Sequence, residues 1–162
     1  SLSNPYVGVL GTFFRRALAQ GSAEVYEDGQ MLRDFVFVDD VVEALRLSNG
    51  NEQTYGQILN VGTGNPVKLK DVATEVFHAL HREPLLMVSG RYRLGDVRHA
   101  VGDISRLSST VQFSPQVSFA LGVKLYVEWA LEHQSPQQEQ AAVDTYADGQ
   151  LLQRNLLRQS GR

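Results

Sequence analysis

Residues 26–43 read YEDGQMLRDFVFVDDVVE, and the remaining elements of the chain are arranged on either side of this segment. Asp28-Gly29 is a two-residue turn signal, because a short polar side chain and a glycine tolerate the positive φ angles of a tight turn. Residues 23–26 can form a short strand, and the aromatic and β-branched run 35–38 is typical of a buried strand. The segment therefore predicts a β-hairpin.

A helix is predicted to follow the hairpin. Asp40 and Glu43 have the spacing of a capping box, and apolar residues then recur at helical spacing as far as Ser48. Arg33 lies just outside the most apolar run of the chain, where its guanidinium would need an anionic partner. Asp34 is one candidate for that partner, and a phosphate group is the other.

Composition bounds the class of protein. The 162 residues suffice for one hydrophobic core and are too few for two ordinary domains. Hydrophobic residues make up 43% and charged residues 20%, the profile of a soluble globular protein, and the net charge of −3 argues against nucleic-acid or anionic-membrane binding. The chain has no cysteine, no membrane-length apolar run and no signal-peptide pattern. We expect a cytoplasmic protein of mixed α and β structure.

Further elements follow from periodicity and breakers. One apolar face, ended by Gly21, predicts an N-terminal helix, and a second such face, which begins at Leu69, predicts a helix that ends near His81-Arg82, before Pro84. Asp103 and Ser118 are placed to cap two later helices, and residues 49–51 form a loop. Short strands are predicted at 57–61 and at 85–88, the latter buried. Residues 1–135 are interpreted as the folded portion and 136–162 as a helical or partly disordered polar tail.

Several motifs resemble functional sites without completing one. The run GVLGTFF at 8–14 lacks the third glycine of a dinucleotide loop and is better explained as a closely packed helix. Gly62-Thr63-Gly64 follows a predicted strand like a phosphate loop, but Asn65-Pro66 interrupts it. His78 and His81 share a helix face without a third metal ligand, which favours a surface pair. None of the six tyrosines has a lysine four residues later.

Four blocks together resemble a known family. NPYVGVLGTFF, VYEDGQMLRDFVFVDDVVEA, LNVGTG and RYRLGDVRHAVGDISR are similar, in order and spacing, to the C-terminal portion of NAD-dependent sugar-nucleotide epimerases and dehydratases. These are extended short-chain dehydrogenase/reductase proteins, and the hairpin and SGRYRLGD segments look most like dTDP-L-rhamnose 4-epimerases and UDP-glucose 4-epimerases. The resemblance implies an α/β fold, in which a small mixed sheet with helices forms the substrate-binding part and most of the Rossmann cofactor domain is absent.

The resemblance also implies roles for five residues. Val25 and Tyr26 match the strand that lies along the nucleotide base, and Arg33 and Arg93 match arginines that contact the diphosphate. Asp96 matches an aspartate that contacts a hydroxyl of the nucleoside sugar. Planar guanidinium groups suit phosphate oxygens, and a carboxylate accepts from a hydroxyl, so the chemistry is consistent. No catalytic residue and no metal ligand is assigned to this chain.

The implied reaction is hydride removal from carbon four of a dTDP- or UDP-hexose and return of the hydride to the opposite face. A firmly held nucleoside diphosphate would leave the sugar free to turn, so that remote binding energy serves positioning. NAD is the implied cofactor, and its glycine-rich loop and the catalytic Tyr-x-x-x-Lys pair are expected outside this chain. The resemblance therefore implies a fragment that is inactive alone and, at full length, a homodimer without nucleic-acid or membrane partners.

Some positions depart from the family pattern, and alternatives stay open. Val7 replaces a polar residue near the phosphates, Lys68 a Ser or Thr cap, and Gln112 a helix-ending glycine. A non-catalytic nucleotide-sugar binding or interaction module is one alternative. The same half of a 4,6-dehydratase or reductase is another.

Overall fold

The computed structural model describes residues 8–133 and 157–159. Within them the chain forms two compact units: the first is drawn from residues 1–31, 68–97 and 123–162, and the second from 32–67 and 98–122. The length of the chain predicts a single core, whereas the structure divides the buried apolar residues between these units. The chain leaves the first unit after Met31 and re-enters it at Lys68, so each unit is built from segments that are not contiguous in the sequence.

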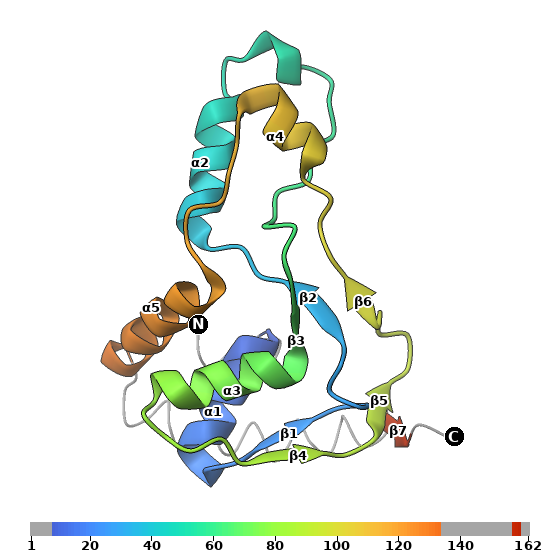
Figure 1. Ribbon diagram of the computed structural model, residues 1–162, viewed down its shortest axis with the longest axis vertical. Helices are drawn as coiled ribbons and strands as arrows, with labels where there is room; N and C mark the ends of the chain where they lie inside the picture. The colour runs from blue at the N-terminus through green and yellow to red at the C-terminus, as the bar shows by residue number, and fades with distance from the viewer. Residues whose placement is uncertain (1–7, 134–156, 160–162) are drawn as a thin grey trace. The chain divides into compact units, whose positions relative to one another are not determined.

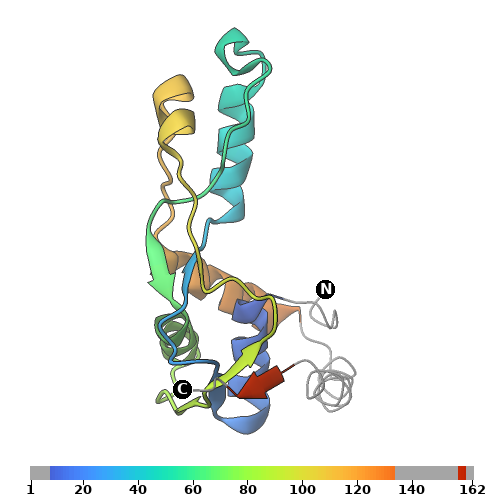
Figure 2. The same cartoon turned by 90° about the vertical axis from the view of Figure 1, so that its right-hand side faces the viewer.

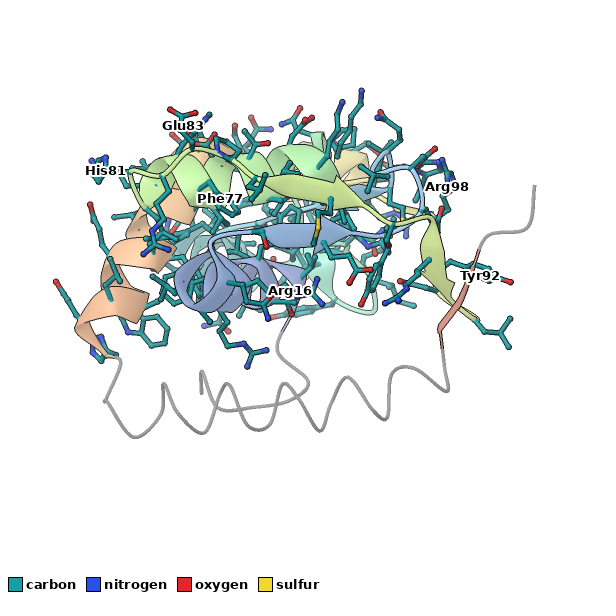
Figure 3. All side chains as sticks on the ribbon, turned by 90° about the horizontal axis from the view of Figure 1, so that it is seen from below. Arg16, Phe77, His81, Glu83, Tyr92 and Arg98 are labelled. Atoms are coloured by element: carbon teal, nitrogen blue, oxygen red, sulfur yellow. The ribbon has the colours of Figure 1, made fainter. Side chains whose placement is uncertain are left out.

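The first unit packs two helices against a short parallel sheet. Its elements are α1 (Val9–Gln20), β1 (Ala23–Val25), α3 (Leu69–Ala79), β4 (Leu86–Val88), β5 (Arg91–Arg93), most of α5 (Phe119–Glu132), and β7 (Leu157–Gln159) (Figure 1). α1 contacts α3, and both helices contact β1. β1 pairs in parallel with β4, with Ala23 opposite Leu86. Phe14 of α1 and Phe77 of α3 are fully buried, and Phe77 is labelled in Figure 3.

The second unit combines a three-stranded sheet with a helix pair. Its elements are β2 (Leu32–Asp34), α2 (Val38–Ser48), the 3₁₀ turn η1 (Glu52–Thr54), most of β3 (Pro66–Lys68), β6 (His99–Ala100) and α4 (Ser105–Val111). The strand order is β3-β2-β6, and β2 runs parallel to β6. α2 and α4 lie side by side (Figures 1 and 2). Between them lies a core cluster made of Ala44, Leu107, Val111 and Phe113.

These elements confirm the α/β class with small sheets. The sheets among the described residues have two, three and two strands. No large parallel sheet of the Rossmann type is present in this part of the chain. The proposed boundary between residues 1–135 and 136–162 stays a prediction, because residues 134–156 lie outside the described ones.

The predicted hairpin is wrong, although its turn is present. Gly29 has a φ of 73°, and its amide donates to the Tyr26 carbonyl at 3.0 Å, as a tight turn requires. The strands on either side do not pair with each other: β1 pairs with β4, and β2 pairs with β3 and β6. A turn signal specifies a local reversal, whereas the strand partners come from distant sequence and are chosen by burial.

The predicted strand 35–38 and the capping box are also wrong. Residues 35–37 are half-buried and belong to no strand, and α2 already begins at Val38. The helix has no side-chain cap. Asp40 lies in its first turn and accepts hydrogen bonds from the amides of Gln116 and Val117 at 2.9 and 3.1 Å. Because the Asp40 carboxylate accepts from these two distant amides, it does not cap the amides at the start of its own helix.

Two further strand predictions need correction. Residues 57–61 belong to no sheet of the described structure. A strand does form near 85–88, at β4, but Met87 and Val88 are 54% and 58% exposed, so it is not buried.

The polar tail was expected to be helical or partly disordered, and most of it lies outside the described residues. Its described part, β7, is instead a strand that pairs antiparallel with β5.

The helices predicted from apolar spacing are confirmed. α1 ends at Gly21, whose φ of 63° is the left-handed conformation expected of a glycine stop. α3 begins after Lys68, which contributes no side-chain cap, as its side-chain type predicts. The hydroxyl of Ser118 accepts from the Leu121 amide at the start of α5, at 3.3 Å. Gln112 ends α4 with a φ of 59°, in the place where a glycine is usual.

Candidate functional site

The end of β1 carries the first two predicted site residues. Val25 is 1% exposed, and its carbonyl accepts from the Ser89 amide at 3.1 Å. Its side chain is therefore part of the core of the first unit, and any contact to a ligand would come from its backbone. Tyr26 follows directly and is half-buried, before the turn at Asp28-Gly29. The turn is stabilised by the Asp28 carboxylate, which accepts from the Gln30 amide at 2.9 Å.

Backbone hydrogen bonds join this end of β1 to the RYRLGD segment. The Glu27 amide donates to the Arg91 carbonyl at 2.7 Å, and the Gly90 amide donates to the Glu27 carbonyl at 3.2 Å. Glu27 adopts a φ of 49°, which is uncommon for a residue other than glycine. Residues separated by more than sixty positions in the sequence are thus held in one local assembly.

A shared carboxylate fixes the start of β5 further. Glu24 of β1 pairs with Arg16 at 3.4 Å and with Arg91 at 3.6 Å. Figure 3 labels Arg16, which is 4% exposed on α1 beside β1. The Arg16–Glu24 contact is shielded from water on both sides, at 4% and 14% exposure, whereas the Arg91 side chain is 42% exposed, so its contact with Glu24 is the weaker of the two. Arg91 is consequently engaged with protein, two residues before Arg93.

Arg93 and Asp96 belong to the same unit as Tyr26. Arg93 is the last residue of β5 and lies opposite Leu157 of β7 in the antiparallel register. Asp96 is exposed after the turn that follows β5. The structure therefore brings the β5 segment and the residues after it to the end of β1. The roles of Arg93 and Asp96 toward a ligand stay predictions.

Arg33 belongs to the second unit, at the centre of β2. The guanidinium nitrogen Nη1 of Arg33 donates to the carbonyl of the preceding residue, Leu32, at 2.8 Å and to the Arg98 carbonyl at 3.0 Å. The side chain is half-buried. These two carbonyl acceptors orient one edge of the planar group. That Arg33 and Arg93 converge on a single diphosphate stays a prediction.

The sequence offered Asp34 as a partner of Arg33, and the structure gives this carboxylate a different set of contacts. It accepts from the amide of Thr63 at 3.0 Å, from the Thr63 hydroxyl, from the Gly64 amide at 3.0 Å and from the Gly102 amide at 3.2 Å. Consecutive residues of a strand point to opposite faces, so Arg33 and Asp34 serve different sides of β2.

These contacts perturb the acidity of Asp34. Burial raises the pKa of the carboxyl, but hydrogen bonds from the Thr63 hydroxyl and from the Thr63, Gly64 and Gly102 amides stabilise the charged form and lower the pKa below its ordinary value. The approach is close: a Cβ on Gly62 would lie 2.5 Å from the Asp34 Oδ2. Only glycine fits at position 62, because any other residue would displace the carboxylate.

The Gly62-Thr63-Gly64 loop is therefore used internally. Its Thr63 and Gly64 amides, which a phosphate loop would direct at a ligand, donate to Asp34. Sequence reasoning missed both Asp34 and Asp40 as the carboxylates that organise this unit. The only sequence signal for this role of Asp34 was a glycine at positions 62 and 102, where the backbone approaches the carboxylate. The spacing of these glycines in the sequence does not identify Asp34 as the residue they approach.

The histidine pair offers no metal site. His78 and His81 are both exposed, and the described part of the chain has no group of three or more His, Cys, Asp or Glu side chains that could hold a metal ion. None of the helices among residues 8–133 has the length and apolar character that crossing a bilayer requires.

Comparison with known proteins places this arrangement in a family. Residues 4–62, which include β1, β2 and α2, match the family model described as NAD dependent epimerase/dehydratase. This segment belongs to that family.

Relatives within the epimerase/dehydratase family match more of the chain. A dTDP-L-rhamnose 4-epimerase of Burkholderia thailandensis is 33% identical over 129 residues, which are 80% of this chain and 35% of the relative. A UDP-N-acetyl-alpha-D-glucosaminuronate decarboxylase of Bacillus cytotoxicus is 30% identical over 133 residues, 79% of this chain and 41% of the relative. The matched relatives thus carry out more than one type of reaction.

A solved structure extends the likeness to three dimensions. The UDP-glucose 4-epimerase of Thermotoga maritima, crystallised with UDP-glucose, superposes with a TM-score of 0.67 at 29% identity. The match covers 80% of this chain and 42% of that one. The chain therefore spans less than half the length of the epimerase/dehydratase proteins it matches here.

Proposed function

We propose that this chain is the substrate-binding portion of an NAD-dependent nucleoside-diphosphate-sugar 4-epimerase, acting on a dTDP- or UDP-hexose. The observation that carries the proposal is the assembly around Glu27, whose backbone bonds hold the end of β1 against the segment that leads to Arg93 and Asp96. The matched epimerases support the type of reaction.

In this proposal the residues of the chain bind and orient the nucleoside diphosphate. Val25 and Tyr26 border the base, Arg33 and Arg93 bind the diphosphate, and Asp96 accepts from a hydroxyl of the nucleoside sugar. The forked N–H groups of a planar guanidinium match the geometry of phosphate oxygens, which supports a diphosphate as the ligand. A substrate held in this way keeps its hexose free to turn about the diphosphate, and the binding energy serves positioning.

NAD is the cofactor we assign to the complete protein, where it would accept and return the hydride at carbon four of the hexose. We do not assign the Gly62-Thr63-Gly64 loop to its site, because the Thr63 and Gly64 amides donate to Asp34. No step of the reaction is therefore assigned to this chain, and we expect the chain alone to be catalytically inactive.

A binding measurement tests the proposal. UDP-glucose and dTDP-glucose should each raise the melting temperature of the chain, and Arg33→Ala should abolish the rise, because a hydrogen bond to a charged group contributes about 1.5–3 kcal/mol, or about 10- to 150-fold in Kd. Arg46→Ala is the matched control, since Arg46 is an exposed arginine of the same unit that pairs with Glu43. An undiminished rise in the Arg33→Ala protein would remove Arg33 from the site.

A second candidate reaction is favoured by the decarboxylase relative, which matches 79% of this chain. The same substrate-binding portion would then serve a decarboxylase, dehydratase or reductase acting on a nucleotide sugar. Residues at the sugar carbons decide between these reactions. Supplying the chain with a cofactor portion and identifying the product by NMR would separate them.

A further inference from the structure

The last described element, β7, is supplied by the polar tail and not by the blocks that resemble the epimerase/dehydratase family. Those four blocks end at Arg106, whereas β7 comprises residues 157–159. β7 nevertheless belongs to the first unit, where it pairs antiparallel with β5 (Figures 1 and 2). In this register Tyr92 lies opposite Arg158. A tail strand therefore lies against the RYRLGD segment, residues 91–96, which carries two of the predicted site residues.

The start of β5 is held by β1 and the turn after it. Glu27 exchanges backbone hydrogen bonds with Gly90 and Arg91, and the Glu24 carboxylate pairs with the Arg91 side chain at 3.6 Å. These contacts fix the segment as far as Arg91. Among the described residues, the strand that pairs with β5 is β7, because β4 pairs with β1 instead. A strand without a partner exposes a row of backbone N–H and C=O groups, and pairing with β7 satisfies part of that row.

The residues after β5 gain little from burial. Leu94 and Val97 are 67% and 60% exposed, and Asp96 is also exposed. Gly95 has a φ of 84°, and no atom lies within 4 Å of the place where a Cβ would be. A segment with few buried contacts opens locally at low cost in free energy, unless a neighbouring ladder fixes its end. The order of residues 94–97 thus depends on how firmly β5 is held just before them.

The pairing of β5 with β7 is suited to control this order. A two-stranded pair of three residues each is a weak element by itself, so it forms or separates with small changes in free energy. Because β7 is on the same chain as β5, the pairing is intramolecular and is not lost on dilution. A segment that is ordered before a ligand arrives loses less conformational entropy on binding, which strengthens the binding.

We propose that β7 is a positioning strand: by pairing with β5 it orders residues 91–96 and so strengthens the binding of a nucleoside diphosphate. The ordering itself requires no ligand. The gain in affinity rests on the proposed function, because it takes Arg93 and Asp96 as ligand contacts. Any change that detaches β7 from β5 then weakens binding without altering a residue that touches the ligand.

The test breaks the β5–β7 ladder in the full chain. Successive N–H groups of an antiparallel strand point alternately toward and away from the partner, so Leu157→Pro/Arg158→Pro removes at least one ladder donor. Leu157→Thr/Arg158→Thr is the matched control, since it changes the same side chains, keeps both N–H groups and suits a strand. Hydrogen exchange of the amides of residues 92–96 should quicken at least about tenfold in the proline variant and stay unchanged in the threonine variant. Exchange in α1 and α3 should be the same in both.

UDP-glucose binding measures the consequence for the site. The Kd should rise at least about tenfold in the proline variant and stay unchanged in the threonine variant, because the ligand must then order the segment itself. A synthetic peptide of residues 153–162, added to the proline variant, should restore both the slow exchange and the lower Kd. A general loss of folding would not be reversed in this way.

Several results would overturn the proposal. Equal exchange at residues 92–96 in the unmodified chain and the proline variant is one, and quickened exchange that extends to α1 and α3 is another. Faster exchange with an unchanged Kd would make β7 a structural strand only, and a lower Kd would make it an inhibitory one. Protection that falls on dilution of the unmodified chain would assign the paired strand to a second copy.

Failure of UDP-glucose to bind the unmodified chain would refute the proposed function instead. The exchange comparison and its rescue by the peptide then still decide whether β7 orders residues 91–96.

Discussion

At the scale of single residues, Asp34 has the widest structural role in the second unit. The Asp34 carboxylate accepts from the amides of Thr63, Gly64 and Gly102. It thereby connects β2 with the Thr63-Gly64 loop and with Gly102. Arg33, next to it, is oriented by two carbonyl groups. Neighbouring residues of one strand therefore make different contacts: Asp34 accepts from two loops, and Arg33 donates to two backbone carbonyls.

Asp34→Asn should lower the free energy of unfolding by about 1–3 kcal/mol at pH 7, because an amide cannot accept from all of these donors. The folded-state pKa of Asp34 is lowered, so its charge stabilises the fold above the unfolded-state pKa. That contribution is lost as the pH falls through the folded-state pKa. Urea unfolding at pH 7 and at decreasing pH measures both effects.

The Asp34→Asn protein should therefore lose less stability on acidification than the unmodified chain. Glu83→Gln makes the same change of charge on an exposed side chain and should leave both the stability and its pH dependence nearly unchanged. Parallel acid profiles for the unmodified chain and the Asp34→Asn protein would contradict the role assigned to this carboxylate.

At the scale of elements, the glycine stop of α1 was predictable, whereas the start of α2 and the strand partners were not. α1 stops at Gly21, and the Arg82 guanidinium donates to the Ala17 and Leu18 carbonyls near that end. α4 stops at Gln112 in the same left-handed conformation, without a glycine. A side chain with a Cβ is disfavoured in this conformation, so α4 ends less favourably than α1.

Gln112→Gly should consequently stabilise the second unit by about 0.5–1 kcal/mol, since glycine adopts the left-handed conformation without steric cost. Ser109→Gly is the control: residue 109 is exposed within α4, where the backbone is helical and glycine is unfavourable, so the unfolding free energy should fall. Chemical denaturation of both variants measures whether each substitution raises or lowers the free energy of unfolding. A loss of stability in both would mean that the φ of Gln112 is not what limits the helix end.

At the scale of the whole molecule, the buried side chains fall into the two units. Phe77 is fully buried in the first unit, and Leu107 is 1% exposed in the second. Each is surrounded by residues of its own unit, as the contacts of α3 with α1 and β1 and those of α4 with α2 show. Stability is therefore expected to respond locally to core substitutions.

Phe77→Ala should cost about 3–5 kcal/mol and Leu107→Ala about 2–5 kcal/mol, through lost burial and the cavity left behind. Hydrogen exchange should quicken mainly in the first unit for Phe77→Ala and mainly in the second for Leu107→Ala. Ser109→Ala, at an exposed position, is the control and should have little effect on exchange. Uniform acceleration across both units in each core variant would show that they unfold as one.

The sequence by itself determined the local features of this protein. The apolar spacing of α1 and α3, the left-handed end at Gly21 and the turn at Asp28-Gly29 all depend on residues within a few positions of each other. The family was recognisable for a related reason: its blocks are short runs whose order and spacing survive in the chain.

Only the tertiary structure decided the pairing of β1 with β4, the division into two units and the partners of Asp34 and Asp40. Of the five predicted site residues, it brought the end of β1 at Tyr26 together with the RYRLGD segment. The physical reason is that strand partners and buried carboxylates are satisfied by groups far away in the sequence. Those groups come within reach only when burial of apolar surface folds the chain, and no local pattern encodes them.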